Sequence, residues 1–281
     1  MSSVKFALRG PCVALSLGLL GAATVTPAHA TIIFSGGDDL DATITVLDLL
    51  TAQVGPVNAL GHSAPPTYNI SQSVASLTAI AGLSVANLGI TTGILNVSAA
   101  SPFMPTPTGT ATASVNNLNL GLNTILLLHE LGISATTISS TSSVSGVGGP
   151  LSAAGSTTIE DLNVGGLAAG LGFSASGTIT PPANDVILNL LGLEVILNAQ
   201  QPLGNGITTD GIVTTAILVD FNNFVLGTGI LNGDIAIAQS EAEISNTTPM
   251  PEPSAWVEMM LGFGLIGAVA RGRAKIRRAA A

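Results

Sequence analysis

The side chains of this chain that could do chemistry are mostly carboxylates, and they occur in three close sets. The sets are Asp38, Asp39 and Asp41; Glu160 and Asp161; and Glu241 and Glu243. Clustered carboxylates can bind Ca²⁺, a hard cation that prefers oxygen ligands, and a carboxylate pair can hydrolyse a glycosidic bond. None of the sets has the spacing of a known calcium loop, so we expect them to be solvated surface charge.

Few other residues are candidates for catalysis. His129 precedes Glu130 in an apolar run, and no second histidine lies at metal-ligand spacing, which predicts a structural histidine. The sequence contains no Gly-x-Ser-x-Gly nucleophile elbow, no glycine-rich loop ending in Lys and no His-Glu-x-x-His zinc motif. We therefore expect no catalytic residue, no metal and no cofactor, and a protein that is not an enzyme.

The basic residues lie only at the two ends of the chain. All 7 Lys and Arg residues lie at or before Arg9 or at or after Arg271. Of the 16 acidic residues, only Glu252 and Glu258 lie outside the stretch from Thr31 to Met250, which leaves 14 within it. A body without cations cannot neutralise phosphates, so the sequence argues against nucleic-acid binding.

The first thirty residues have the order of a secretory signal peptide. Lys5 and Arg9 give a short positive region, Val13 to Val25 is apolar, and Ala28 and Ala30 fit a small-x-small cleavage site. We expect export through the secretion translocon and cleavage after Ala30. The only cysteine, Cys12, lies in the segment to be removed, so the mature protein has no thiol and no disulfide.

The last thirty residues form a second distinct segment. Pro251-Glu252-Pro253 and Trp256 precede an uncharged run from Met259 to Ala270, and a basic cluster follows. The apolar residues are Met259, Met260, Leu261, Phe263, Leu265 and Ile266, and the basic ones are Arg271, Arg273, Lys275, Arg277 and Arg278. The run is shorter than the roughly 20 residues of a stable transmembrane helix. Trp256 and the basic cluster suit the two membrane interfaces, so we expect a short helix that holds the protein in the inner membrane transiently.

In order and spacing, this ending resembles the PEP-CTERM sorting signal of Gram-negative bacteria. The resemblance implies recognition by an exosortase, a membrane-embedded transpeptidase-like enzyme that removes the tail and passes the protein to the cell surface. It also implies an association with exopolysaccharide and biofilm matrix. Glu258 departs from the pattern, because an apolar residue is more usual there.

Between these ends the hydropathy alternates with period two. Leu171 to Ile179 reads as a half-buried strand, and Gly211 to Phe221, apolar on both faces, reads as a central strand. The alternation of Thr110 to Leu120 changes phase near Asn116 and Asn117, which predicts a β-bulge. In Asp234 to Ile244 we expect Ala236, Ala238, Ser240, Ala242 and Ile244 to share one face.

Turn-rich pieces separate these runs, and few stretches are convincingly helical. The sequence predicts an all-β, two-layer antiparallel sandwich of many short strands plus the C-terminal helix, with a β-solenoid as the alternative. Ser71 to Leu88 and Asn123 to Gly132 fit either a helix or a strand. The expected domains are a signal peptide at 1–30, an extracellular β domain at 31–244, a linker at 245–250 and the sorting signal at 251–281.

Residues 98–244 also resemble the choice-of-anchor P family of extracellular proteins, whose shared domain precedes one or another surface anchor. The matching segments include "TASVNNLNL", "STTIEDLNVGG", "GIVTTAILVDF" and "GDIAIAQSEAEI". That resemblance carries no catalytic residues.

Two functions remain from different classes. The favoured one is an exported, non-catalytic surface or matrix protein with a structural or adhesive role, and exopolysaccharide or other matrix components as its partners. The alternative is a secreted polysaccharide hydrolase that uses a carboxylate pair. Aromatic residues are only 3% of the chain, which disfavours a sugar-cleaving site. Two carboxylates about 5 to 10 Å apart in a cleft would favour the hydrolase.

Overall fold

A computed structural model describes residues 31–46, 50–82, 86–102, 106–124, 130–146, 150–168, 171–226 and 229–246, which belong to one compact unit. The expected signal peptide, cleavage site, sorting motif, C-terminal helix and basic cluster lie outside these residues, as does His129. The first described strand begins at Thr31, directly after the expected cleavage site. The last one ends at Asn246, two residues beyond the domain boundary that we expected.

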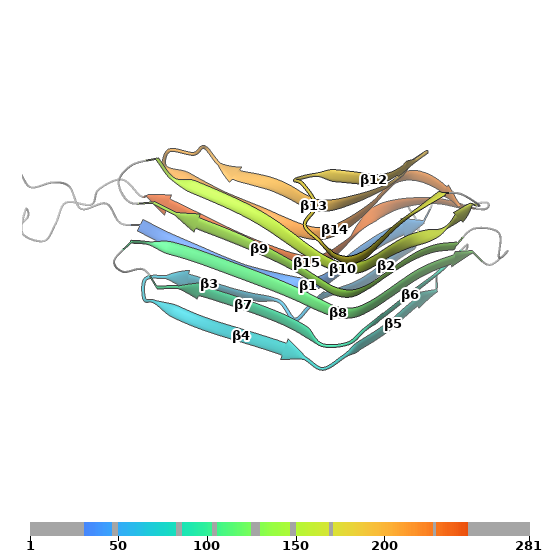
Figure 1. The fold of residues 1–281 in the computed structure, drawn as a ribbon, viewed down its shortest axis with the longest axis horizontal. Coiled ribbons are helices and arrows are strands. Elements are labelled where there is room, and N and C mark those ends of the chain that lie inside the picture. Colours follow the sequence, from blue (N-terminus) through green and yellow to red (C-terminus); the bar gives the residue numbers. More distant parts are fainter. Residues whose placement is uncertain are drawn as a thin grey trace, which may run out of the picture. The chain divides into compact units, whose positions relative to one another are not determined.

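The described strands form two antiparallel sheets (Figure 1). Sheet A has the order β12 (Asp185–Leu190), β13 (Leu193–Gly204), β14 (Thr209–Leu226), β15 (Gly229–Asn246), β1 (Thr31–Val46) and β2 (Leu50–Val57), and β3 (Leu60–Ala64) also pairs with β1. Sheet B has the order β11 (Leu171–Ile179), β10 (Ser152–Ala168), β9 (Glu130–Ser145), β8 (Thr108–Thr124), β6 (Ala86–Thr92) and β5 (Leu77–Gly82). In addition, β7 (Leu95–Ser101) pairs with β8, and β4 (Tyr68–Val74) pairs with β7.

This architecture confirms the predicted all-β sandwich. Every strand pair is antiparallel, which excludes the parallel coil of a β-solenoid. The described residues from Ser71 to Leu88, which fitted a helix or a strand, lie in β4, β5 and β6 apart from Ala75 and Ser76. Among the residues that the structure describes, no helix is long and apolar enough to cross a membrane.

The local predictions for β11 and β14 are confirmed, whereas β8 has the predicted change of phase without the predicted β-bulge, because β8 and β9 keep one register across it. β11 coincides with Leu171–Ile179, and β14 lies inside sheet A with partners on both sides. In β8 the buried positions change phase from Val115 to Leu118, and Asn117 between them has a φ of 49°. Asn tolerates this left-handed conformation better than most residues, because its short side chain can bond locally.

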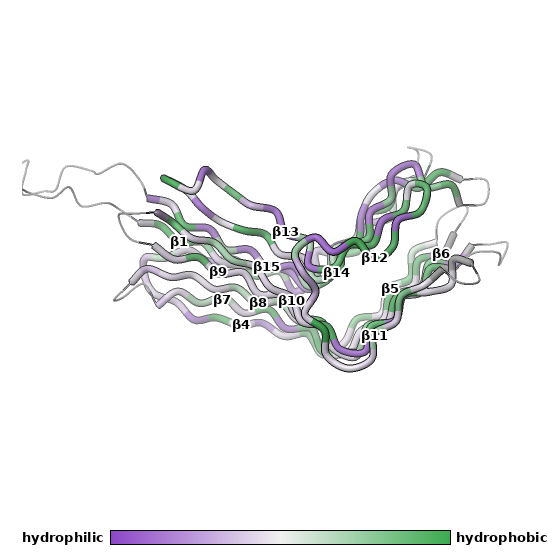
Figure 2. The backbone as a smooth tube through the Cα atoms, turned by 45° about the horizontal axis from the view of Figure 1, so that its top comes forward, coloured by the Kyte–Doolittle hydropathy of each residue, from purple (hydrophilic) through white to green (hydrophobic). Residues whose placement is uncertain are grey.

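The strands of both sheets bend near their middles (Figure 2). At the bend several residues have left-handed backbone conformations: Asn117 and Asp161 in sheet B, and Asn198 and Ala238 in sheet A. In sheet A the register skips the residues between Leu197 and Ala199 on β13 and between Ile237 and Gln239 on β15. The bend is therefore built from aligned irregularities on neighbouring strands, which turn the side chains beyond them to the other face.

One consequence is a correction to the predicted face of β15. Ile235 and Ile237 point into the core before the bend, whereas Ser240 and Ala242 do so after it. Ala236 therefore lies on the outer face of sheet A. The single alternating face that we predicted is wrong, because the left-handed residue Ala238 shifts the alternation by one position.

The core between the sheets consists of a large and a small aliphatic cluster. Ile138 and Ala238 belong to the large cluster, and Val144 and Ala242 to the small one. The inward positions between them carry hydroxyl groups. Ser142 donates to Thr214 Oγ1 over 2.8 Å, and Ser140 donates to Ser240 Oγ over 3.0 Å. These buried bonds join sheet B to sheet A, since the paired residues lie in different sheets.

Candidate functional site

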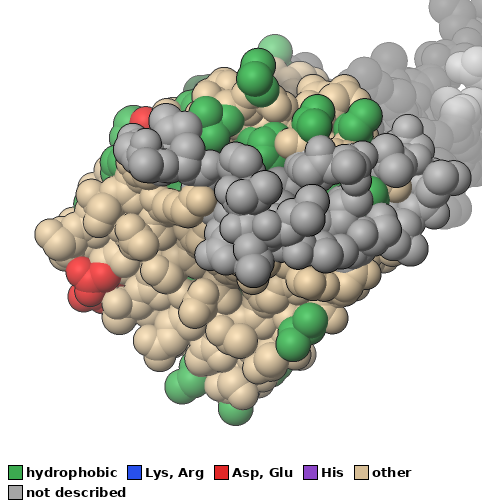
Figure 3. All heavy atoms as spheres, turned by 90° about the vertical axis from the view of Figure 1, so that its right-hand side faces the viewer, with side chains coloured by type: hydrophobic (Ala, Val, Ile, Leu, Met, Phe, Trp, Pro, Cys, Tyr) green, Lys and Arg blue, Asp and Glu red, His purple; other side chains and the backbone are tan. Residues whose placement is uncertain are grey.

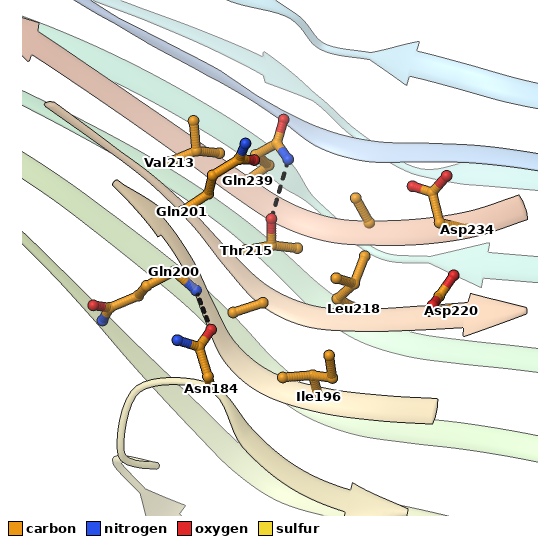
Figure 4. A pocket seen from close by; sticks show the side chains of 12 residues that line it. Asn184, Ile196, Gln200, Gln201, Val213, Thr215, Leu218, Asp220, Asp234 and Gln239 are labelled. Carbon is orange, nitrogen blue, oxygen red and sulfur yellow. Dashed lines mark hydrogen bonds between the residues drawn. The ribbon is translucent and has the colours of Figure 1, made fainter. Parts of the chain in front are cut away.

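A groove of about 410 Å³ crosses the outer face of sheet A (Figure 4). It lies over β13, β14 and β15, at the level of the bend. Its floor is aliphatic and includes Ile196, Leu218 and Ala236. Ala236 reaches this floor because Ala238 reverses the alternation of β15. The left-handed backbone of Ala238, which we did not predict, therefore helps to form the groove.

One end of the groove is acidic. Glu194, Asp220 and Asp234 lie directly opposite one another on β13, β14 and β15, and we name them the acidic row. Asp220 and Asp234 line the groove itself. Burial, Asp41 and Asp220 all raise the pKa of Asp234. Like charges directly opposite one another destabilise a sheet, so the acidic row lowers the stability of the fold. Packing does not explain why three carboxylates lie there.

The other end of the groove carries amides and a hydroxyl. Gln239 donates to Thr215 Oγ1 over 3.0 Å, and Asn184 accepts a bond from the backbone N–H of Gln200 over 2.8 Å. Gln201 also lines this end. The groove thus offers carboxylate acceptors, amide donors and acceptors, and an apolar floor along one surface.

We expected Asp38, Asp39 and Asp41 to be solvated surface charge, and the structure shows that this expectation is wrong. Asp39 is fully buried, and its carboxylate spans the two sheets. Asn58 donates to its Oδ2 over 2.5 Å, and the backbone N–H of Ser114, on β8, donates to its Oδ1 over 3.0 Å. Burial raises the pKa of Asp39 to about 7, although these two hydrogen bonds act in the opposite direction.

Its neighbours Asp38 and Asp41 are half-buried, and each has one buried carboxylate oxygen without a hydrogen-bond partner among the described residues. Burial, together with Asp41, raises the pKa of Asp38 to about 6. Asp38 and Asp41 lie outside the groove lining. Asp39 instead holds the sandwich together at the bend.

The other two predicted sets also lie outside the groove lining, although Glu241 is the cross-strand partner of Val213, which lines the groove. Asp161 has a φ of 53°, accepts from Gly177 N–H over 2.8 Å and from Thr136 Oγ1 over 3.2 Å, and so stabilises the bend of sheet B. Glu241 and Glu243 are half-buried on β15, where burial and then Glu243 raise the pKa of Glu241. The structure does not bring the three sets together.

Sequence reasoning missed the acidic row, because its members are far apart in the chain. Asp220 lies in an apolar run, and its alignment with Asp234 is a matter of strand register, which local composition does not reveal. Within the described residues, no group of three or more His, Cys, Asp and Glu side chains is arranged to hold a metal ion.

Carboxylates, amides and an apolar floor can together bind a polyhydroxylated or other polar ligand by hydrogen bonds and surface contact. Side chains visible at the end of the sandwich in Figure 3 are mostly neutral, with isolated acidic groups.

Comparisons of the chain with protein families, with curated proteins and with solved structures found no match.

Proposed function

We propose that this chain is an exported protein that an exosortase processes and delivers to the cell surface or the extracellular matrix. The observation that carries the proposal is the order of Pro251-Glu252-Pro253, Trp256, an uncharged apolar run and a basic cluster at the end of a chain whose body has no Lys or Arg. The signal-peptide pattern before Thr31 supports the same route.

We infer a non-catalytic structural or adhesive role for the body of the protein. A two-sheet scaffold with a polar groove on one face supports this inference, since all but one of the hydrogen-bonding side chains that line the groove lie on strands, the exception being Asn184. Exopolysaccharide or another matrix component is the proposed partner.

The sorting proposal is tested by mass spectrometry of the protein from cells with and without the exosortase. With the enzyme, we expect a C-terminus near the Pro251-Glu252-Pro253 motif; without it, we expect a tail that is intact through Ala281. Joint replacement of Pro251, Glu252 and Pro253 by Ala should leave a membrane-bound precursor. As a matched control, Glu258→Leu makes the segment more typical of the signal and should preserve delivery. An intact tail in both strains would overturn the proposal.

A specific observation also favours the second candidate, a polysaccharide hydrolase. Asp220 and Asp234 are direct cross-strand partners in one groove, and with Cβ atoms about 4.5 to 5.5 Å apart in such pairs, their carboxyl groups can reach the separation that glycosidases use. A retaining glycosidase needs two carboxyl groups about 5 to 5.5 Å apart. Release of reducing sugar from neutral polysaccharides by the native protein, abolished in both Asp220→Asn and Asp234→Asn, would favour the hydrolase over the adhesive role.

A further inference from the structure

The groove on the outer face of sheet A is followed by a second hollow at its acidic end. Asp220 lines both the groove and this hollow, which has a volume of about 280 Å³ and is also lined by Asn189, Glu194 and Asn222. We name the groove and the hollow together the trough. Along β14 its lining runs from Val213 to Asn222, which is at most about 30 Å at 3.3 Å per residue. A trough of this length suits a linear polymer better than a single small molecule.

Carboxylates are spread along the trough and do not converge on one point. The acidic row crosses it, and Asp38 and Asp41 lie beside it on β1. Their cross-strand partners on β15, Gln239 and Ala236, line it. Asp38 and Asp41 each keep a buried carboxylate oxygen that has no hydrogen-bond partner among the described residues. Since no three such side chains in the described part of the chain are arranged to hold a metal ion, these oxygens fit a ligand with several positive groups in a row.

The body of the protein does not supply that positive charge. Its described residues include no Lys or Arg, and His62 on β3 is the one histidine among them. The basic residues at the two ends belong to segments that we expect to be removed. A second copy of the body would bring more carboxylates to the acidic row, and an anionic polymer would be repelled by it. The occupant that complements the trough is therefore a cationic polymer.

The trough presents side chains rather than free backbone groups. β13, β14 and β15 each have a strand partner on both sides, so their N–H and C=O groups are paired within sheet A. An extended basic peptide that pairs its backbone with a sheet edge finds no such edge here. The amides of Asn184, Gln201 and Asn222 suit the hydroxyl groups of a polysaccharide. Among the described residues that line the trough, none is aromatic, so sugar rings gain no stacking and ionic contacts carry the affinity.

We propose that the trough binds a linear polysaccharide whose repeating units carry free amino groups. This inference rests on the matrix-binding role proposed above and names the class of polymer. The ammonium groups lie against the acidic row and beside Asp38 and Asp41, and the hydroxyl groups bond to the amides at the two ends of the trough. The bound polymer relieves the repulsion between Asp220 and Asp234. N-acetylation of the amino groups removes their charge and with it the match to the acidic row.

The test is isothermal titration calorimetry of the full-length chain in mild detergent, in a mildly acidic buffer that keeps the amino groups charged. The probes are a β-1,4-linked glucosamine hexamer, its fully N-acetylated counterpart and hexalysine. We expect the glucosamine hexamer to bind at least about tenfold more tightly than either of the other two probes. Its affinity should fall by roughly tenfold between about 0.05 and 0.5 M NaCl, because salt screens the ionic contacts.

Variants locate the binding in the trough. Asp234→Asn should weaken the binding of the glucosamine hexamer by roughly tenfold, and Asp220→Asn should do the same. Glu160→Gln is the matched control, since it also removes one negative charge but lies on β10 in sheet B. It should bind the hexamer like the native chain.

Two results would overturn the requirement for amino groups and leave the matrix-binding role in place. They are equal affinities for the two hexamers, and a native affinity in both Asp220→Asn and Asp234→Asn. Tighter binding of hexalysine would assign the trough to a basic peptide and overturn the proposal. Binding of neither hexamer would contradict the matrix-binding role as well, whereas the sorting proposal is tested separately by the mass of the C-terminus.

Discussion

Asp39 shows how one residue can join two sheets at the cost of an unfavourable charge. Its carboxylate is fully buried and bonds to Asn58 and to the backbone of Ser114 across the core. The pKa of Asp39 rises from 3.8 to about 7, and that of Asp38 from 3.8 to about 6. The folded state therefore binds protons more readily than the unfolded chain, because a buried carboxyl is more stable when neutral.

Because the pKa values of Asp38 and Asp39 are raised in the folded state, we expect the protein to be most stable in mild acid. A raised folded-state pKa gives a stabilising contribution below about pH 4 that is lost as the pH rises through about 7. We expect the free energy of unfolding in urea to be lower at pH 8 than at pH 5 by roughly 1 to 3 kcal/mol, since each pKa unit is worth about 1.4 kcal/mol.

Asp39→Asn should remove much of that pH dependence. The amide keeps an acceptor for Ser114, and Asn58 can present its unpartnered Oδ1 to the new donor. Asp38→Asn should remove a smaller part, centred near pH 6. A native protein that is more stable at pH 8 than at pH 5 would show that these carboxyls do not govern its pH dependence.

At the scale of the strands, sheet B contains a row of glycines that its own packing does not require. Gly89, Gly121, Gly132 and Gly165 lie directly opposite one another on β6, β8, β9 and β10. A Cβ added at any of them would meet no atom closer than 3.7 Å. Glycine weakens a strand, because the unfolded chain has more conformations to lose.

We expect Gly121→Ala and Gly132→Ala each to raise the free energy of unfolding by roughly 0.5 to 1 kcal/mol, through lower entropy of the unfolded chain. Gly233→Ala is the control, because we expect it to lower the free energy of unfolding. Gly233 has a φ of 123°, and a Cβ there would lie 2.0 Å from Thr43 O, so the substitution should destabilise by more than about 2 kcal/mol. Equal effects at Gly132 and Gly233 would contradict this account.

The strands also show what the sequence can and cannot predict. The change of phase at Asn117 was predictable, because the alternation of apolar residues shifts there and Asn favours a left-handed backbone, but it is not the β-bulge that we predicted, since β8 and β9 keep one register across it. The equivalent feature at Ala238 was not, since alanine rarely adopts that conformation and its small neighbours fit either face. The acidic row depends on register across three strands, which is the same on both sides of the bend and which local composition does not reveal.

At the scale of the whole molecule, the acidic residues lie mainly in the body of the chain and the basic residues lie only at its two ends. From Thr31 to Met250 the chain carries 14 acidic residues, which is 16 less Glu252 and Glu258, and no Lys or Arg. Mutual repulsion of these charges opposes compaction, and no cationic side chain other than histidine offsets it. The acidic row concentrates this effect on one face of sheet A.

Salt should therefore stabilise the protein, because mobile ions screen repulsion over a Debye length that falls from about 30 Å at 0.01 M to about 10 Å at 0.1 M. We expect the midpoint of thermal unfolding at pH 8 to rise by several degrees between about 0.01 and 0.3 M NaCl. The double variant Asp220→Asn/Asp234→Asn should be more stable at low salt and should gain less from added NaCl, since it lacks two charges of the acidic row. A native midpoint that is unchanged or lower at 0.3 M NaCl would mean that repulsion does not limit the stability of this fold.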